Sequence, residues 1–262
     1  MEFLLHISAG ALVGFAIGLT GVGGGSLMTP LLLLFGYPAP VAIGTDLLYA
    51  AITKAGGAWS HHRRANVDWK VVLLMGLGSI PVSLLMHVFF LDRGFQESDE
   101  FEGLLTFSLG IMLIITALIL IFRDRLRKGA VEDRPELLML GLHRHRSLFT
   151  WFMGLLLGVC VTLSSVGAGA FGAAILMVIY SSTPVARIIG TDLAHAVPLT
   201  FVAGLGYLAS GYVDTVLLLS LLIGSLPAIH FGSKLSSQIP DGVLQRILIT
   251  LLLALGIYYS HS

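Results

Sequence analysis

The tetrapeptide Gly-Thr-Asp-Leu occurs twice in this chain of 262 residues, at 44–47 and at 190–193. The copies lie 146 residues apart, and other residues recur at the same spacing. The matched residues are Gly21 and Gly23 with Gly167 and Gly169, Pro38 with Pro184, Val67 and Asp68 with Val213 and Asp214, and Gly78, Ser79 and Pro81 with Gly224, Ser225 and Pro227. The chain is therefore an internal duplication. Two halves with glycine and proline breaks at matching places are typical of secondary transporters, which bind substrate between such repeats.

The composition is that of a membrane protein. Hydrophobic residues make up 56% of the chain and charged residues 11%, whereas soluble domains carry about 25% charged residues. Crossing the hydrocarbon core takes about 20 apolar residues as a helix, and no strand-like alternation of about 10 residues is visible. The sequence predicts an all-α, polytopic membrane helix bundle. The formal net charge of zero gives no reason to expect a nucleic-acid partner.

Five apolar segments can be marked in each half. They are 3–19, 27–36, 41–60, 69–91 and 103–122, and then 148–163, 170–180, 185–209, 213–231 and 243–259. The second segment of each half is short. Ten residues of helix span about 15 Å, half of a bilayer, so these two segments are predicted to be broken or re-entrant helices.

The basic residues predict how the chain is divided and oriented. We divide it into a first transmembrane repeat (1–122), a basic linker (123–147) and a second repeat (148–262). Seven of the fifteen Lys and Arg residues lie in the linker, which is therefore expected to be cytoplasmic, either as a plain connector or as a patch that binds membrane lipid.

The loops of the two repeats carry opposite charge. Arg63 and Arg64 follow the third segment, while the equivalent loop at 210–214 has no basic residue. This swap favours inverted repeats in the cytoplasmic (inner) membrane, with both termini outside the cytoplasm. A parallel arrangement of four spans per half is the alternative, and it leaves the swap unexplained.

Glycines interrupt the apolar pattern before each short segment. At a helix start they expose backbone N–H groups, which together with the helix dipole favour an anion. Close helix packing is the alternative role of such glycines, and capping is the alternative role of the neighbouring serines. The candidate substrate-binding residues are Gly21, Gly23, Gly24, Gly25 and Ser26 in the first half, and Ser164, Ser165, Gly167 and Gly169 in the second.

Asp46 and Asp192 follow the two Gly-Thr pairs. They either complement the start of a helix or, as ionisable groups at membrane depth, mark an ion or proton path. His195 lies three residues after Asp192, on the same helical face, so the two could share a proton. Tyr49 takes this position in the first half, and any relay is therefore asymmetric.

Two basic residues could neutralise a substrate anion. Arg187 lies near the start of its helix, where extension of its side chain to the membrane interface is the alternative role. Lys54 lies deep in the third segment, and its equivalent in the second half is Thr200, so the duplication itself does not demand a charge there. His61 and His62 lie in a basic loop and favour a surface role over a metal site.

With this pattern the chain resembles the TauE/SafE family of sulfite exporters, whose members carry a glycine-rich stretch, a proline and then a Gly-Thr pair. The stretch 21–32, GVGGGSLMTPLL, followed by Gly44 and Thr45, matches closely. The resemblance covers essentially the whole chain and implies an inner-membrane permease for sulfite or organosulfonates without a redox cofactor. Two features depart from the family pattern. The second half has GAGAFGAAILMV without a proline, and an Asp follows each Gly-Thr pair where Ser is more usual.

The sequence therefore predicts an exporter of a small sulfur oxyanion or organosulfonate that is coupled to protons through Asp46, Asp192 and His195. It is not expected to be an enzyme, and no metal or cofactor is expected. A homodimer is a possible assembly. Two alternatives stay open: a cation or metal carrier that uses the two acids and His195, and an intramembrane hydrolase that pairs Ser164 or Ser165 with His195.

Overall fold

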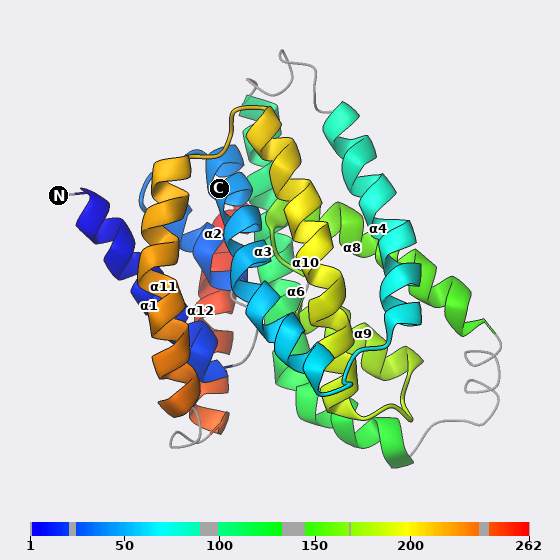
Figure 1. Ribbon diagram of the computed structural model, residues 1–262. Coiled ribbons are helices and arrows are strands. Elements are labelled where there is room, and N and C mark those ends of the chain that lie inside the picture. Colours follow the sequence, from blue (N-terminus) through cyan, green and yellow to red (C-terminus); the bar gives the residue numbers. More distant parts are fainter. Residues whose placement is uncertain are drawn as a thin grey trace.

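The computed structural model describes residues 2–20, 25–89, 99–132, 145–167, 169–235 and 241–261, and within these ranges its regular elements are helices (Figure 1). In chain order they are α1 (Glu2–Thr20), α2 (Gly25–Leu34), α3 (Ala39–Arg63), α4 (Trp69–Phe89), α6 (Asp99–Glu132), α8 (Arg146–Ser164), α9 (Ala170–Ile179), α10 (Val185–Ala209), α11 (Thr215–Leu235) and α12 (Asp241–His261). The predicted all-α fold is confirmed.

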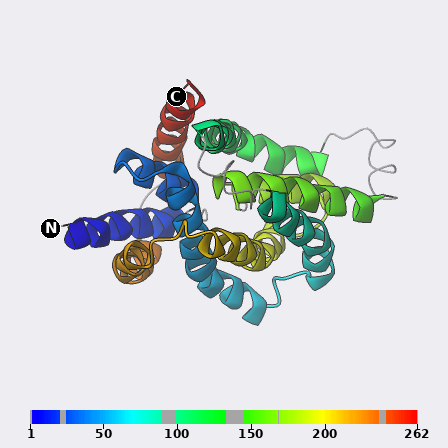
Figure 2. The ribbon, with the colours of Figure 1, turned by 90° about the horizontal axis from the view of Figure 1, so that it is seen from above.

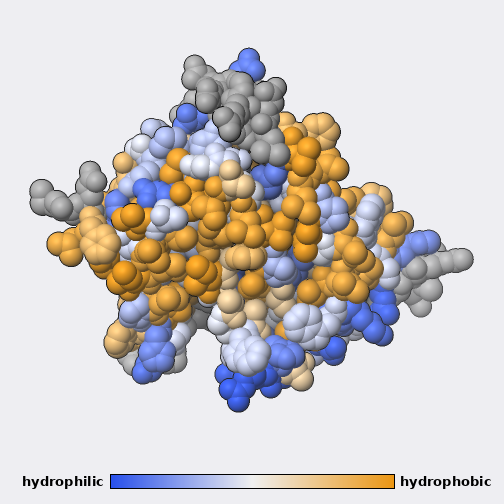
Figure 3. Space-filling view, turned by 45° about the horizontal axis from the view of Figure 1, so that its top comes forward, coloured by the Kyte–Doolittle hydropathy of each residue, from blue (hydrophilic) through white to orange (hydrophobic). Residues whose placement is uncertain are grey.

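Within the described ranges, five helices are long and apolar enough to cross a membrane. They are α4, the Glu100–Phe122 part of α6, α8, α10 and α11. Large apolar side chains such as Leu77 and Leu219 are more than half exposed on the outside of the bundle, and apolar residues cover most of the face in Figure 3. In water such an apolar surface would make the protein associate with other molecules. In a membrane the same surface contacts lipid chains. The chain is a multi-pass membrane protein.

Each of the ten predicted apolar segments corresponds to one helix. The short segments are α2 and α9, with 10 residues each. Matching residues begin the longer helices: α3 and α10 each follow a proline, Pro38 and Pro184, whose φ angle suits a helix start. Asp68 and Asp214 cap α4 and α11 by accepting hydrogen bonds from backbone N–H groups of the first turn. One boundary differs, because α6 continues to Glu132 into the region assigned to the linker.

The two halves exchange helices. The first helix of each half packs against the fourth helix of the other, α1 on α11 and α8 on α4 (Figures 1 and 2). The contacts are equivalent: Gly10 meets Leu221 as Gly154 meets Met75, and Gly14 meets Ser225 as Gly158 meets Ser79. At each of these glycines an added Cβ would lie 2.3–2.6 Å from a backbone atom of the partner helix. The glycines therefore set a backbone approach that no side chain permits.

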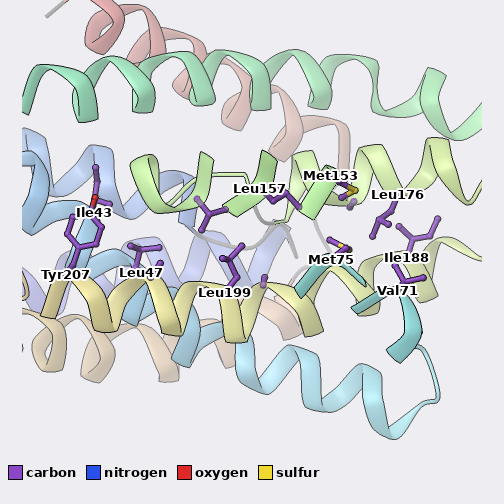
Figure 4. Packing of buried hydrophobic residues seen from close by; sticks show 14 of the residues in the cluster. Ile43, Leu47, Val71, Met75, Met153, Leu157, Leu176, Ile188, Leu199 and Tyr207 are labelled. Carbon is purple, nitrogen blue, oxygen red and sulfur yellow. The ribbon is translucent and has the colours of Figure 1, made fainter. Parts of the chain in front are cut away.

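The third helices, α3 and α10, form the antiparallel centre of the bundle. Gly44 lies against Tyr207, Gly204 against Leu48, and Gly190 against His61, so α3 runs along α10 from the C-terminal end of α10 to its start. Apolar side chains fill the space beside this pair in a row from Tyr207 to Ile188 (Figure 4). The repeated Gly-Thr-Asp sequence thus lies on both central helices, away from lipid.

Candidate functional site

Two aspartates, a lysine and a histidine are buried on the two central helices. Asp46 and Lys54 belong to α3, and Asp192 and His195 to α10. Each is at most 4% exposed. Because charged groups are costly at membrane depth, they tend to face partners or a path for ions. Their partners therefore define the candidate site.

Asp46 is held by the short helix α2. The hydroxyl of Thr29 donates a 2.5 Å hydrogen bond to Asp46 Oδ2, and the backbone N–H of Thr29 donates a second one of 3.2 Å to the same oxygen. Ser165, from the second half, lies beside this carboxylate, although its hydroxyl does not reach hydrogen-bond geometry. Asp46 therefore joins α2, α3 and the end of α8.

Asp192 is held by the start of the other short helix. The backbone N–H of Gly169 donates a hydrogen bond to its carboxylate. Gly172, in the first turn of α9, faces Asp192 Oδ1 so closely that an added Cβ would lie 2.1 Å from that oxygen. The N-terminal end of α9 therefore accommodates a carboxylate, as expected for unpaired N–H groups at a helix start.

Replacing Gly172 by alanine is expected to displace the Asp192 carboxylate, because the carboxylate and a methyl group cannot occupy the same space. We expect a loss of about 1–3 kcal/mol in the free energy of unfolding, measured by thermal unfolding in detergent. Gly56→Ala is the matched control, because an added Cβ at Gly56 would meet nothing within 4 Å. Equal stability of the two variants would contradict the close contact.

Lys54 is shared between the two acids. Its ammonium interacts electrostatically with the carboxylates of Asp46 and Asp192, and it also acts on His195. Thr200, its equivalent in the second half, instead donates a 2.8 Å hydrogen bond to the carbonyl of Ala196 in its own helix. The duplicated acids thus surround a single lysine that the duplication does not repeat.

His195 lies at 2.8 Å from Ser79, between Nε2 and the serine hydroxyl. Both side chains are fully buried. In the equivalent place Tyr49 lies beside Ser225, without a hydrogen bond of good geometry. The same two positions therefore meet in both halves, but one pair contains an imidazole and the other a phenol.

The second glycine loop lies between the two acids. Gly167 and Gly169 have φ angles of 121° and 132°, which favour glycine over other residues, and Ser165 ends α8 in a left-handed conformation. Ser165 lies next to Asp46 and Gly169 next to Asp192. The loop that the sequence singled out is therefore part of the same site as the acids and Lys54.

Ser164, Gly25 and Ser26 lie at the ends of helices. Ser164 caps the end of its own helix, with its hydroxyl 2.6 Å from the carbonyl of Cys160 and 3.2 Å from the N–H of Val166. Gly25 and Ser26 are the first residues of α2. Three of the candidates, Gly21, Gly23 and Gly24, lie outside the described residues.

Arg187 is not brought to the buried acids. Its side chain is 47% exposed and forms a 3.5 Å ion pair with Asp68, in the turn before α4. The backbone N–H of Asp68 also donates a 2.9 Å hydrogen bond to the hydroxyl of Thr191. Arg187 therefore ties the start of α10 to the turn at 64–68, and of the two candidate cations only Lys54 lies among the acids.

The structure also shows which hydroxyl lies at His195. The hydroxyl at its Nε2 atom belongs to Ser79, and neither Ser164 nor Ser165 provides it. Among the described residues, no three His, Cys, Asp or Glu side chains are grouped so that they could hold a metal ion.

Sequence reasoning missed Thr29 and the role of Ser79. Thr29 lies in the motif 21–32, one residue before Pro30, and Ser79 was noted only as a repeated residue. A threonine inside an apolar ten-residue helix was the available signal, because a buried hydroxyl needs a partner.

Comparison with known proteins finds relatives along nearly the whole chain. The sequence profile described as "Sulfite exporter TauE/SafE" matches residues 6–259. The chain is 36% identical to "Probable membrane transporter protein YjnA" of Bacillus subtilis (strain 168), over 96% of this chain and 97% of that protein. It is 28% identical to "Probable membrane transporter protein YdhB" of the same organism, over 89% and 90% of the two chains.

A third relative is a "Probable membrane transporter protein" of Xylella fastidiosa (strain Temecula1), 24% identical over 98% of this chain and 94% of that protein. No solved structure matches the chain. The profile match over nearly the whole length and the resemblance to transporters from end to end lead to one conclusion: this protein is a membrane transporter of the sulfite exporter TauE/SafE family.

Proposed function

We propose that the protein exports a small sulfur oxyanion, such as sulfite, or an organosulfonate across the cytoplasmic membrane, and that this transport is coupled to protons. The proposal rests on one observation: two buried carboxylates, Asp46 and Asp192, share Lys54 beside the glycine loop at 165–169. The family description supports sulfite as the first substrate to test.

Charge at the site connects the anion to protons. If both carboxylates are ionised and Lys54 is protonated, the three groups carry a net charge of −1, which repels an anion. If both carboxylates are neutral, the net charge is +1, which attracts one. For two unit charges roughly 8 Å apart, at an effective dielectric constant of about 20, the interaction is worth about 2 kcal/mol. Anion binding therefore favours proton uptake by Asp46 and Asp192.

The helix arrangement supports inverted repeats. The equivalent helices α3 and α10 are antiparallel, and each half packs its first helix on the fourth helix of the other. Transporters built from inverted repeats alternate access by moving one set of helices against the other around a central site. In this proposal the basic turn at 63–64 and the linker at 123–147 face the cytoplasm, and both termini lie outside it.

Flux of sulfite into proteoliposomes, with and without an imposed pH gradient, tests the proposal. We expect flux driven by the gradient in the wild-type protein and a loss of about 100-fold in Asp46→Asn or Asp192→Asn, which corresponds to about 2.8 kcal/mol. Asp214→Asn is the matched control, because Asp214 caps α11 away from the site and asparagine caps equally well.

Two results would contradict the proposal. Absence of flux for sulfite and for organosulfonates, in vesicles that contain folded protein, would remove this substrate class. Flux driven by the gradient in both Asn variants would remove the buried acids from the coupling.

The two buried carboxylates also favour a second candidate, a cation carrier, since in their ionised form they attract positive charge. The transported ion distinguishes the two functions. Flux of labelled sulfite supports anion transport, and current carried by a cation in the absence of any transported anion supports the second candidate.

A further inference from the structure

Three polar side chains follow one face of α4 at intervals of one helical turn: Ser79, Ser83 and His87, which we call the α4 strip. Ser79 and Ser83 are fully buried. Residues four apart lie on the same side of a helix, and this side faces α8 and α10. The α4 strip extends from His195, at the candidate site, toward the C-terminal end of α4 at Phe89.

Each member of the α4 strip meets a neighbouring helix. Ser79 lies 2.8 Å from His195 Nε2, and the hydroxyl of Ser83 is 2.8 Å from that of Thr162 in α8. His87 packs directly on Gly206 of α10, and its ring meets that of Tyr207 edge to face at 5.3 Å between centroids. The α4 strip is thus enclosed by protein from the centre of the bundle outward.

The duplication shows that packing does not require these groups. The equivalent residues in α11 are Ser225, Ile229 and Ser233. The backbone carbonyl of Ile229 lies against Gly18 of α1, in the place where Ser83 meets Thr162. The same helix contact is therefore made in the other half by an isoleucine and a glycine. A buried pair of hydroxyls in a membrane helix contact needs another reason.

His195 provides an independent observation that favours a functional role for the α4 strip. Its Nε2 atom faces Ser79, while its Nδ1 atom is buried without a hydrogen-bond partner among the described residues. An imidazole can take up a proton at one nitrogen and release one from the other. Lys54 from α3 acts electrostatically on His195, and Asp192 lies three residues before it in the same helix.

We propose that the α4 strip is the proton path between the candidate site and the membrane face at which α4 ends. This inference rests on the proton coupling in the proposed function. Each hydroxyl accepts a proton on its oxygen as it gives up its own, so no charge remains on it. His195 accepts a proton at Nε2 and releases one from Nδ1 toward Asp192, whose carboxylate becomes neutral. Successive members of the α4 strip are about 5–6 Å apart at Cβ, a gap that one water molecule bridges.

The path has a direction. α4 begins after the turn that contains Arg63 and Arg64, which the proposed topology assigns to the cytoplasm. The α4 strip therefore opens toward the outer face, and the candidate site takes up protons from and releases protons to the outside.

Two assays on the same vesicles test the path. The first measures proton uptake with a pH dye inside the vesicles while sulfite moves. The second measures exchange of labelled for unlabelled sulfite, which needs no net proton movement. For Ser83→Ala we expect proton uptake to fall at least about tenfold, since a positioned proton-transfer group typically contributes about 10²–10⁴-fold, with exchange unchanged. Ser83→Thr, which keeps a hydroxyl, restores uptake, and Ser225→Ala, at the position equivalent to Ser79, leaves it unchanged.

Three results would overturn the proposed path. Equal loss of uptake and exchange in Ser83→Ala would show a structural role and overturn the path. Normal proton uptake in Ser83→Ala, with coupling intact in the wild type, would overturn the path alone. Absence of proton movement with sulfite in the wild-type protein would overturn both the path and the proton coupling of the proposed function.

Discussion

We expect that replacing Lys54 by methionine abolishes transport. Within the part of the chain that the structure describes, Lys54 is the one basic side chain beside the buried acids. It interacts electrostatically with both Asp46 and Asp192. Methionine keeps much of the volume of the side chain and removes the charge, which leaves two carboxylates buried without a counter-ion. Loss of one partner of a buried ion pair typically costs about 3–5 kcal/mol. If the same free energy is lost from anion binding, sulfite flux or the affinity for sulfite falls about 10²–10⁴-fold.

The duplication offers a control for this prediction. Thr200 is equivalent to Lys54 in the other half, on the partner central helix and fully buried. The double variant Lys54→Thr with Thr200→Lys moves the charge across the pair of helices without changing the composition of the chain. We expect it to recover flux at least about tenfold over Lys54→Thr alone, because a cation near the pseudo-equivalent position again faces both acids. Unimpaired flux in Lys54→Met would show that no buried cation is needed for the anion.

Replacing Gly158 by leucine is expected to prevent stable folding. An added Cβ at Gly158 would lie 2.6 Å from the carbonyl oxygen of Ser79, and this atom belongs to the rigid backbone of α4. A leucine must therefore push α8 and α4 apart along the whole contact. Overpacking costs about 1–3 kcal/mol in a core that can relax, and more where it cannot. We expect the loss to exceed about 3 kcal/mol, visible as aggregation in size-exclusion chromatography after extraction in detergent.

Gly103→Leu is the control for this experiment. Gly103 lies in α6, and an added Cβ there would meet nothing within 4 Å. It should therefore leave the elution profile unchanged. Folded, monodisperse Gly158→Leu protein would contradict the close approach of α8 to α4, and with it the geometry that places Ser79 next to His195.

The local features of the fold could be predicted because they depend on residues close in the chain. Apolar stretches long enough for the membrane must be helical, since lipid leaves no other partner for backbone groups. Pro38 and Pro184 mark the starts of the central helices, and the glycines at 167 and 169 mark the break before α9. The inverted orientation of the repeats stays a prediction, although the antiparallel α3 and α10 support it.

The ionisable residues of the candidate site could be predicted from the sequence. The side chains that each of them contacts could be predicted less well. Asp46, Asp192, Lys54 and His195 were identified as polar groups in apolar segments, and all four are buried together on the central helices. Arg187 has the same charge as Lys54 and lies in a similarly apolar region, but it forms an exposed ion pair with Asp68. A position near a helix start does not tell which way a long, flexible side chain extends.

The duplication, the helical class, the two short helices and the acids in apolar segments follow from the amino-acid sequence, because repeats, hydropathy and glycine breaks are local or periodic properties of a chain. The exchange of helices between the halves, the hydrogen bond from Thr29 to Asp46 and the contact of Ser79 with His195 follow from the three-dimensional packing. These contacts join residues 17 and 116 positions apart. They depend on how closely glycine-lined helices approach one another, which is a property of packing in three dimensions and not of any segment alone.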